Sequence, residues 1–332
     1  MRLGVFGIGA IGGYIGGRLA ASGTDVVLVG RRALDGLVTT DLDGTTKRAA
    51  VAVGTDPAAL ASCDAVLVCV KSAQSAEAAT TLAKIVGGAT IVSMQNGVRN
   101  ADVLREKLPN VLGGIVGFNV VSKEDGTFRR ATSGPLVVED RDGARPIVAE
   151  LERAGFEALA ERDIQSMQWS KLVMNLNNAV SALSNAPTRD IVLTPGYRKC
   201  VGAIVAEALD VMRAAGIRPK KIGPLPVAVF PYALRLPTPL IQIVARAQLK
   251  IDPEARSSMW EDLSRKRHTE VDFLNGEIVR LAKSIGKHAP INERVVELVH
   301  EVEAKREGSP KMSPDDLWRA LHSTARARTP AA

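Results

Sequence analysis

The sequence is poor in cysteine, histidine and aromatic residues, and each shortage excludes a class of protein. Among 332 residues there are three cysteines, four histidines and 4% aromatic residues. Three scattered cysteines form no disulfide framework, so we expect reduced thiols in a cytoplasmic protein. The histidines lack the spacing of metal ligands, and no metal site is expected. So few aromatic side chains provide no stacking platform for single-stranded nucleic acid.

The chain also lacks an apolar run of about 18 residues, the length that a membrane-spanning helix requires. A content of 46% hydrophobic and 24% charged residues is typical of a soluble globular protein. The net charge is +7, but the basic residues are spread along the chain rather than gathered in stripes. We therefore expect attraction of small anionic ligands and neither nucleic-acid nor membrane binding.

A glycine-rich loop stands at the start of the chain. The apolar run Leu3–Phe6 predicts a buried strand, and a helix-compatible stretch covers residues 11–21. Between strand and helix, the first glycine of G-x-G-x-x-G allows a tight turn and the second lets backbone approach a pyrophosphate. The third lets the helix pack closely, and the helix N-terminus faces the negative charge. The residues expected to bind a dinucleotide are Gly7, Gly9, Ala10, Ile11 and Gly12.

This segment has two alternative interpretations, a signal peptide and a glycine-rich turn of another fold. Arg2 followed by small apolar residues resembles a signal peptide, but seven glycines between Gly4 and Gly17 and the lack of a clear cleavage site argue against export. A glycine-rich turn of an unrelated α/β fold is the second alternative.

The residues after the next expected strand indicate which dinucleotide binds. Val26–Val29 leads into Gly30, Arg31 and Arg32, about 20 residues beyond the glycines, where NAD enzymes usually carry an acidic residue for the ribose hydroxyl. A guanidinium instead suits a 2′-phosphate, because it donates paired, charge-assisted hydrogen bonds. The sequence therefore predicts NADP(H), with Arg31 as the first candidate; at least one of the two arginines is expected to be a solvated turn residue.

Strand and helix patterns alternate through the first half of the chain, which predicts a mostly parallel, doubly wound sheet. Near Asp163 the pattern changes to helix after helix. We predict an α/β protein with a Rossmann-type domain (1–163), an all-α domain (164–325) and a short tail (326–332). The other elements expected in the first domain are strands at 64–70, 89–94, 111–121, 136–139 and 156–159, a helix at 147–154 and a turn-rich excursion at 42–54.

Polar residues follow two of these strands. Lys71 comes directly after the strand at 64–70, and Asn96 and Gly97 follow the strand at 89–94. In open α/β sheets the ligand crevice lies beyond the carboxyl ends of the strands, so both sites fall where cofactor and substrate meet. The alternatives are a solvated loop lysine and a simple Asn-Gly turn.

Two segments of the second half carry further candidates. At about 100° per residue, Lys171, Asn175 and Asn178 fall within an arc of about 60° on one helix. Asparagines need partners when buried, and the surrounding Leu, Val and Met leave little polar face, so a functional role is favoured over solvent exposure. Farther along, Ser258 and Glu270 lie about 120° out of phase on a straight helix, so periodicity does not unite them.

Taken together, these residues resemble the ketopantoate reductase family, the 2-dehydropantoate 2-reductases. The resemblance spans almost the whole chain in the family's order. It implies an N-terminal Rossmann domain, a helical C-terminal domain, and an active site in the cleft between them. It also implies reduction of ketopantoate to pantoate by NADPH, a step towards coenzyme A. The matching features are Gly7-x-Gly9-Ala-x-Gly12, Arg31, Val70-Lys71-Ser-Ala-Gln74, Asn96-Gly97, Trp169-x-Lys171-x-x-x-Asn175, Ser257-Ser258-Met259 and Thr269-Glu270.

The resemblance also implies roles for individual residues. Lys171 is the general acid, Glu270 a carboxylate that binds and orients substrate, and Ser258 a substrate ligand. Lys71 and Asn96 position nicotinamide and substrate. Desolvation would lower the pKa of Lys171 towards the operating pH, and Glu270 would oppose that fall.

The chain departs from the family pattern at two places. The second asparagine, eight residues after the lysine in the family, is replaced by Ala179, so we assign Asn178 and Asn175 to the substrate. An asparagine shortly before the serine pair is replaced by Ala255-Arg256. Arg256 either holds a substrate carboxylate in a different way or does not contact it.

The leading hypothesis is an NADPH-dependent reductase of a small anionic 2-oxo acid, most simply ketopantoate. The alternatives are a related reductase of another oxo or imino acid and a non-catalytic NADP-binding module. The apolar helical domain is able to bury a homodimer interface, but no patch is identified from the sequence.

Overall fold

The computed structural model describes residues 1–123, 125–221, 226–244 and 254–323. The chain forms two compact units, Met1–Gln168 and Trp169–Ala332. The division falls inside α5 (Ile164–Asn175), whereas the sequence places it between 163 and 164. The limits 1–163 and 164–325 stay predictions, and the expected tail 326–332 lies outside the described residues.

The N-terminal unit contains an eight-stranded sheet in the order β12-β11-β8-β7-β6-β1-β2-β5. Neighbouring strands pair in parallel, except that β8 and β11 are antiparallel. The predicted doubly wound α/β sheet is thereby confirmed. Its strands are β1 (Leu3–Phe6), β2 (Val26–Val29), β5 (Val53–Gly54), β6 (Ala65–Val68), β7 (Thr90–Ser93), β8 (Val111–Val116), β11 (Leu136–Glu139) and β12 (Ala158–Glu161).

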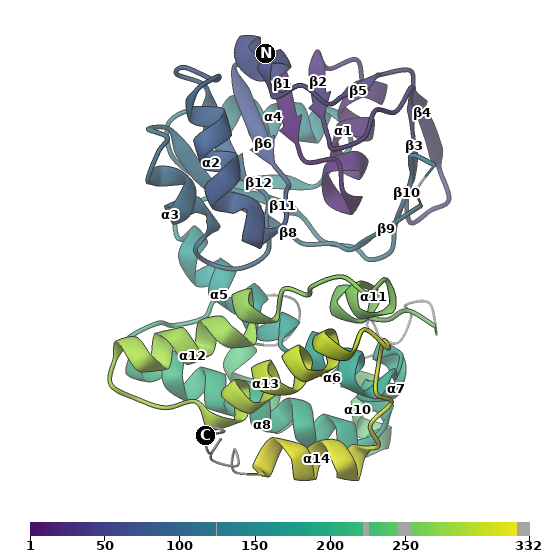
Figure 1. Ribbon diagram of the computed structural model, residues 1–332, viewed down its shortest axis with the longest axis vertical. Coiled ribbons are helices and arrows are strands. Elements are labelled where there is room, and N and C mark those ends of the chain that lie inside the picture. Colours follow the sequence, from purple (N-terminus) through teal and green to yellow (C-terminus); the bar gives the residue numbers. More distant parts are fainter. Residues whose placement is uncertain (124, 222–225, 245–253, 324–332) are drawn as a thin grey trace, which may run out of the picture. The chain divides into compact units, whose positions relative to one another are not determined.

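Helices cover both faces of this sheet (Figure 1). Successive strand side chains point to opposite faces, so Leu67 joins the core beneath one pair of helices and Val66 the core beneath the other. The first pair is α1 (Ala10–Ala21) and α4 (Ala144–Arg153); the second is α2 (Ser75–Ala83), preceded by the 3₁₀ turn Ser72–Gln74, and α3 (Asn100–Arg105). The strand order reverses between β1 and β6, which is the switch point where open α/β sheets bind ligands.

A second sheet, in the order β4-β3-β10-β9, packs against α1. A Cβ atom on Gly13 would lie 2.1 Å from the ring of Phe128, so this glycine allows the close approach. The strands are β3 (Leu37–Thr40), β4 (Thr46–Ala49), β9 (Val120–Ser122) and β10 (Thr127–Arg130).

Three expectations about strands were wrong in detail. The turn-rich excursion at 42–54 contains β4 and β5; β4 is an edge strand with lysine and arginine, a composition that hides a strand from a hydrophobicity pattern. The strand expected at 111–121 divides into β8 and β9, which belong to different sheets. The short strand expected at 156–159 is β12, which begins at Ala158, because Phe156 packs beside Tyr14 instead.

The C-terminal unit is helical, as predicted: its described residues form helices, and none of them belongs to a β-strand. The long α8 buries one apolar face and contacts most of the other helices. No helix in the described ranges is long and apolar enough to cross a membrane. Besides the end of α5, the helices are α6 (Asn177–Ser184), α7 (Thr188–Leu193), α8 (Pro195–Ala214), α9 (Phe230–Ala233), α10 (Thr238–Val244), α11 (Ser258–Ser264), α12 (Asn275–Ser284), α13 (Pro290–Lys305) and α14 (Pro314–His322).

Candidate functional site

The glycine loop has the backbone geometry that each glycine position demands. Gly7 has φ +101°, a left-handed conformation, and a Cβ atom on Gly12 would lie 2.1 Å from the carbonyl oxygen of Gly7. At Gly9, the N-cap of α1, an added Cβ would meet no protein atom within 4 Å. Gly7 therefore makes the turn and Gly12 the close packing, while the space beside Gly9 is open.

The N-terminus of α1 offers hydrogen-bond donors. No side chain caps it, and its first turn holds no acidic residue. The first N–H groups of a helix have no partner inside the helix, which here are those of Ala10, Ile11 and Gly12. Together with the helix dipole, these donors favour an anionic group.

Arg31 and Arg32 are both exposed just after β2 and Gly30. β2 is the neighbour of β1, so both strands end on the same edge of the sheet. The structure thus places the two arginines just beyond the carboxyl end of β2, at the same edge of the sheet as the glycine loop. Their assignment to a 2′-phosphate stays a prediction.

Lys71 and Asn96 lie at the carboxyl ends of the paired strands β6 and β7, and the structure brings their loops together. The hydroxyl of Ser72 donates to the carbonyl oxygen of Asn96 (3.0 Å), and the side-chain amide of Asn100 donates to the same oxygen. Lys71 is exposed, whereas Asn96 is half-buried.

A buried network of neutral side chains supports these two loops. Gln95 donates to the carbonyl oxygen of Val70 (3.0 Å) and to the hydroxyl of Ser75 (2.8 Å), and it accepts from Ser93 (2.9 Å). Ser75 in turn donates to Asn100 (2.8 Å). Sequence reasoning missed the roles of Ser72, Ser75, Gln95 and Asn100. Their signal was polar residues clustered just after two apolar strands, because buried polar groups must find partners.

The lysine-asparagine segment is two helices rather than one. α5 ends at Asn175, Leu176 forms a turn, and α6 begins at Asn177. Lys171 and Asn175 share one helix as expected, but Asn178 belongs to the next helix, so the prediction of one helix for all three was wrong. All three side chains are half-buried. Two asparagines, which are poor helix formers, flank the break at Leu176.

Lys171 and Glu270, far apart in sequence, interact electrostatically. Burial lowers the pKa of Lys171 to about 8, and the charge of Glu270 opposes this fall. Glu270 is half-buried at the start of the 3₁₀ turn Val271–Phe273. An amine with such a pKa exchanges its proton near neutral pH, which suits a general acid.

The two neighbouring serines have different surroundings. Ser257 is the N-cap of α11: its hydroxyl accepts from the N–H of Trp260 (3.1 Å) and donates to the carbonyl oxygen of Asn178 (3.0 Å). These bonds join α6 to α11 and bring Asn178 near the exposed Ser258. This role of Ser257 was not predicted, although serine before a helix with Glu261 in its first turn is a typical cap.

Arg256 is engaged in local contacts. Its Nε donates to the carbonyl oxygen of Asn185 (3.0 Å), and Nη1 donates to Glu254. The guanidinium also stacks over the ring of Trp260, whose Nε1 donates to the side chain of Asn185 (2.7 Å). Of the two alternatives for Arg256, these contacts favour the one in which it does not contact the substrate. Arg256 then links Asn185, at the end of α6, to the residues just before α11.

Among the described residues, no group of three His, Cys, Asp or Glu side chains is arranged to hold a metal ion. The three cysteines are free, and burial raises the pKa of Cys69 to about 12. Burial moves the pKa of Lys171, in contrast, towards neutral pH.

Comparison with known proteins identifies the family. Residues 3–143 match the family "Ketopantoate reductase PanE/ApbA", and residues 163–303 match its C-terminal counterpart. A 2-dehydropantoate 2-reductase of Halobacterium salinarum is 31% identical over 93% of this chain and 100% of its own length.

Solved structures agree in fold. The crystal structure of a PanE/ApbA family ketopantoate reductase from Ralstonia eutropha JMP134 superimposes with a TM-score of 0.80 at 29% identity, covering 92% of this chain and all of that one. D-mandelate dehydrogenase with NADH and anilino(oxo)acetate superimposes with a TM-score of 0.74 at 21% identity over 92% and 99% of the two chains, a likeness of fold. With both family matches and relatives of full length, the chain belongs to the ketopantoate reductase family and is an oxidoreductase.

Proposed function

We propose that this protein reduces 2-dehydropantoate (ketopantoate) to pantoate with NADPH, and that Lys171 donates the proton. The observation that carries the proposal is the desolvated amine of Lys171, whose pKa burial lowers to about 8 and the charge of Glu270 raises. The names of the full-length relatives, 2-dehydropantoate 2-reductases, support the substrate.

The residues of the N-terminal unit fit a dinucleotide. The open space beside Gly9 and the uncapped N–H groups of Ala10, Ile11 and Gly12 suit a pyrophosphate. In the proposal Arg31 holds the 2′-phosphate, which selects NADPH over NADH. Lys71 and Asn96, on the loops that the neutral network fixes, position nicotinamide and substrate. When bound, the cofactor supplies the hydride.

Lys171 completes the reaction on the other atom of the carbonyl group. Hydride addition to the carbonyl carbon leaves negative charge on oxygen, and the Lys171 ammonium gives that oxygen a proton, forming the alcohol. Glu270 orients the substrate and keeps Lys171 protonated more often than burial alone would allow. A positioned acid of this kind accelerates a reaction by about 10²–10⁴-fold. Asn175, Asn178 and Ser258 are the proposed substrate ligands.

Steady-state assays with purified protein test the proposal. NADPH oxidation is followed with ketopantoate and a panel of branched 2-oxo acids, and then with NADH in place of NADPH. We expect the highest kcat/KM for ketopantoate with NADPH. Absence of turnover with every 2-oxo acid would refute it.

The second candidate is a reductase of a different 2-oxo acid, and Arg256 favours it. This arginine replaces an asparagine expected before the serine pair, and it contacts Asn185 and Glu254 close to Ser258 in sequence. A panel member with a kcat/KM above that of ketopantoate would establish this candidate.

We also propose that the protein forms a homodimer. Gel filtration across a concentration series tests this proposal.

A further inference from the structure

The segment that carries Glu270 has little regular structure of its own. Between α11 and α12, the hydroxyl of Thr269 accepts from the N–H of Val271 (3.2 Å), and the short turn Val271–Phe273 follows. Contacts from a neighbouring helix must therefore determine where Glu270 lies. That helix is α13.

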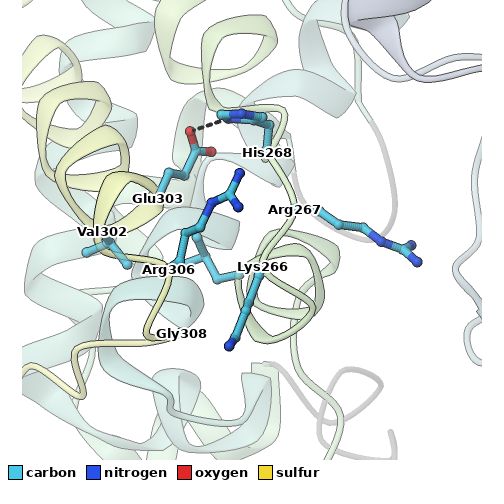
Figure 2. A pocket seen from close by; sticks show the side chains of 8 residues that line it. Lys266, Arg267, His268, Val302, Glu303, Arg306 and Gly308 are labelled. Carbon is cyan, nitrogen blue, oxygen red and sulfur yellow. Dashed lines mark hydrogen bonds and ion pairs between the residues drawn. The ribbon is translucent and has the colours of Figure 1, made fainter.

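Two side chains of α13, one helical turn apart, contact this segment. One oxygen of Glu303 accepts from the N–H of Thr269 (2.7 Å), and the other pairs with Nδ1 of His268 (3.2 Å). His300 pairs with Asp272 (3.1 Å) on the other side of Glu270. Figure 2 shows the carboxylate of Glu303 turned toward the ring of His268.

The two contacts differ in burial. The side chain of Glu303 is 9% exposed, whereas His300 and Asp272 are 46% and 54% exposed. A buried carboxylate accepting from a backbone N–H makes a strong, charge-assisted bond, and an exposed ion pair contributes little. Glu303 is therefore the contact that fixes the residue next to Glu270.

We propose that Glu303 is a positioning residue, which holds the N–H of Thr269 and thereby keeps Glu270 where it orients substrate and sustains the charge of Lys171. The inference rests on the proposed function of Lys171 and Glu270. Glu303 itself touches no substrate in this account. Its charged neighbours are His268, which pairs with it, and Lys266, Arg267 and Arg306, which line the same surface pocket (Figure 2).

Three variants separate positioning from general stability. Glu303→Ala removes both contacts. Glu303→Gln keeps an oxygen that accepts from Thr269, so it restores the position without the charge. Glu301→Ala is the matched control, because Glu301 lies on the same helix, is 54% exposed and pairs with Arg294 rather than with residues 268–272.

The pH dependence of kcat/KM is the readout. If Glu270 is displaced, it no longer raises the pKa of Lys171, so the fall of activity at alkaline pH begins at lower pH. We expect Glu303→Ala to move this limb down by roughly half a pH unit and to lower kcat/KM about tenfold. Glu303→Gln is expected to stay within about threefold of the wild type with its limb unmoved. Glu301→Ala should match the wild type.

Amine labelling gives a second readout that needs no turnover. The rate of reductive methylation at Lys171, followed by mass spectrometry across pH, should reach half its maximum at lower pH in Glu303→Ala and Glu270→Gln. Thermal unfolding of each variant confirms that it is folded.

The outcomes distinguish this inference from the proposed function. If Glu270→Gln moves the limb and Glu303→Ala does not, the inference is overturned and the proposed function stands. Equal losses in Glu303→Ala and Glu303→Gln, parallel to lowered melting temperatures, also overturn it, because they indicate a structural role. Full turnover in Lys171→Ala refutes the proposed mechanism instead.

Discussion

The two units of this protein use different chemistry to hold their candidate residues. Beneath Lys71 and Asn96, the N-terminal unit has neutral serines and amides that satisfy one another: Ser72, Ser75, Gln95 and Asn100. Around Glu270, the helical unit has charged groups, with Lys171, His268 and Glu303 in one region.

The difference follows from the tasks proposed for them. A binding loop needs a fixed backbone, and a network of neutral hydrogen bonds provides rigidity without a change of charge near neutral pH. Proton transfer needs a group that changes charge, so an amine and a carboxylate must be partly desolvated together. Substitutions in the neutral network should alter stability or cofactor affinity. Substitutions of the charged groups should alter the rate of the reaction and its pH dependence.

The largest effect is expected from Lys171→Ala. Removing the proton donor should lower kcat by about 10²–10⁴-fold, while a fluorescence titration should give nearly unchanged NADPH affinity. Equal loss of both would contradict the separation of roles between the two units.

Gln95→Ala tests the neutral network. It removes the hydrogen bonds that Gln95 makes with Ser75, Ser93 and the carbonyl oxygen of Val70, which should cost about 3 kcal/mol in the free energy of unfolding. The alkaline limb of activity should stay in place. Asn110→Ala is the control, because its amide donates to Gly88 at an exposed position; a similar loss there would argue against a special role for the network.

Two glycines of the loop should respond in opposite ways. A methyl group at Gly12 collides with the carbonyl oxygen of Gly7, so Gly12→Ala should lower the free energy of unfolding by about 2 kcal/mol. Gly9→Ala adds a methyl group into open space and should leave unfolding unchanged while weakening NADPH binding. Denaturant unfolding and cofactor titration check both, and intact NADPH affinity in Gly9→Ala would remove the pyrophosphate from this position.

The smallest of these effects concerns the choice of cofactor. Arg31→Ala should raise the KM for NADPH about tenfold, the effect of losing one charge-assisted hydrogen bond, with little change for NADH. Arg32→Ala is the comparison variant. If Arg32→Ala has the greater effect, the assignment moves by one residue.

The sequence predicted the parts of the molecule that depend on local pattern. The strand–glycine–helix order at residues 3–21 follows from backbone preferences of neighbouring residues. The edge strand β4 was not predicted, because pairing with β3 makes it a strand and its own polar composition does not.

In the candidate site, too, local pattern did not predict contacts between distant residues. Asn178 lies on a different helix from Lys171 because of the break at Leu176. No periodicity of the sequence predicted that Glu270 lies near Lys171 or that Glu303 contacts Thr269. These contacts join residues that are tens of positions apart in the chain, and tertiary packing creates them. Ser257 belongs to one of the matching motifs and Gln95 directly precedes another, but only their hydrogen bonds reveal what they hold.

The pH profile of kcat/KM with NADPH and ketopantoate, measured for the wild type and Glu270→Gln, tests the central claim most directly. Lys171 must be protonated to give its proton, so wild-type activity should fall as pH rises through about 8. Because Glu270 raises that pKa, the fall should begin at lower pH in Glu270→Gln. A profile without an alkaline limb, or a limb that moves to higher pH in the variant, would contradict the assignment of Lys171 as the general acid.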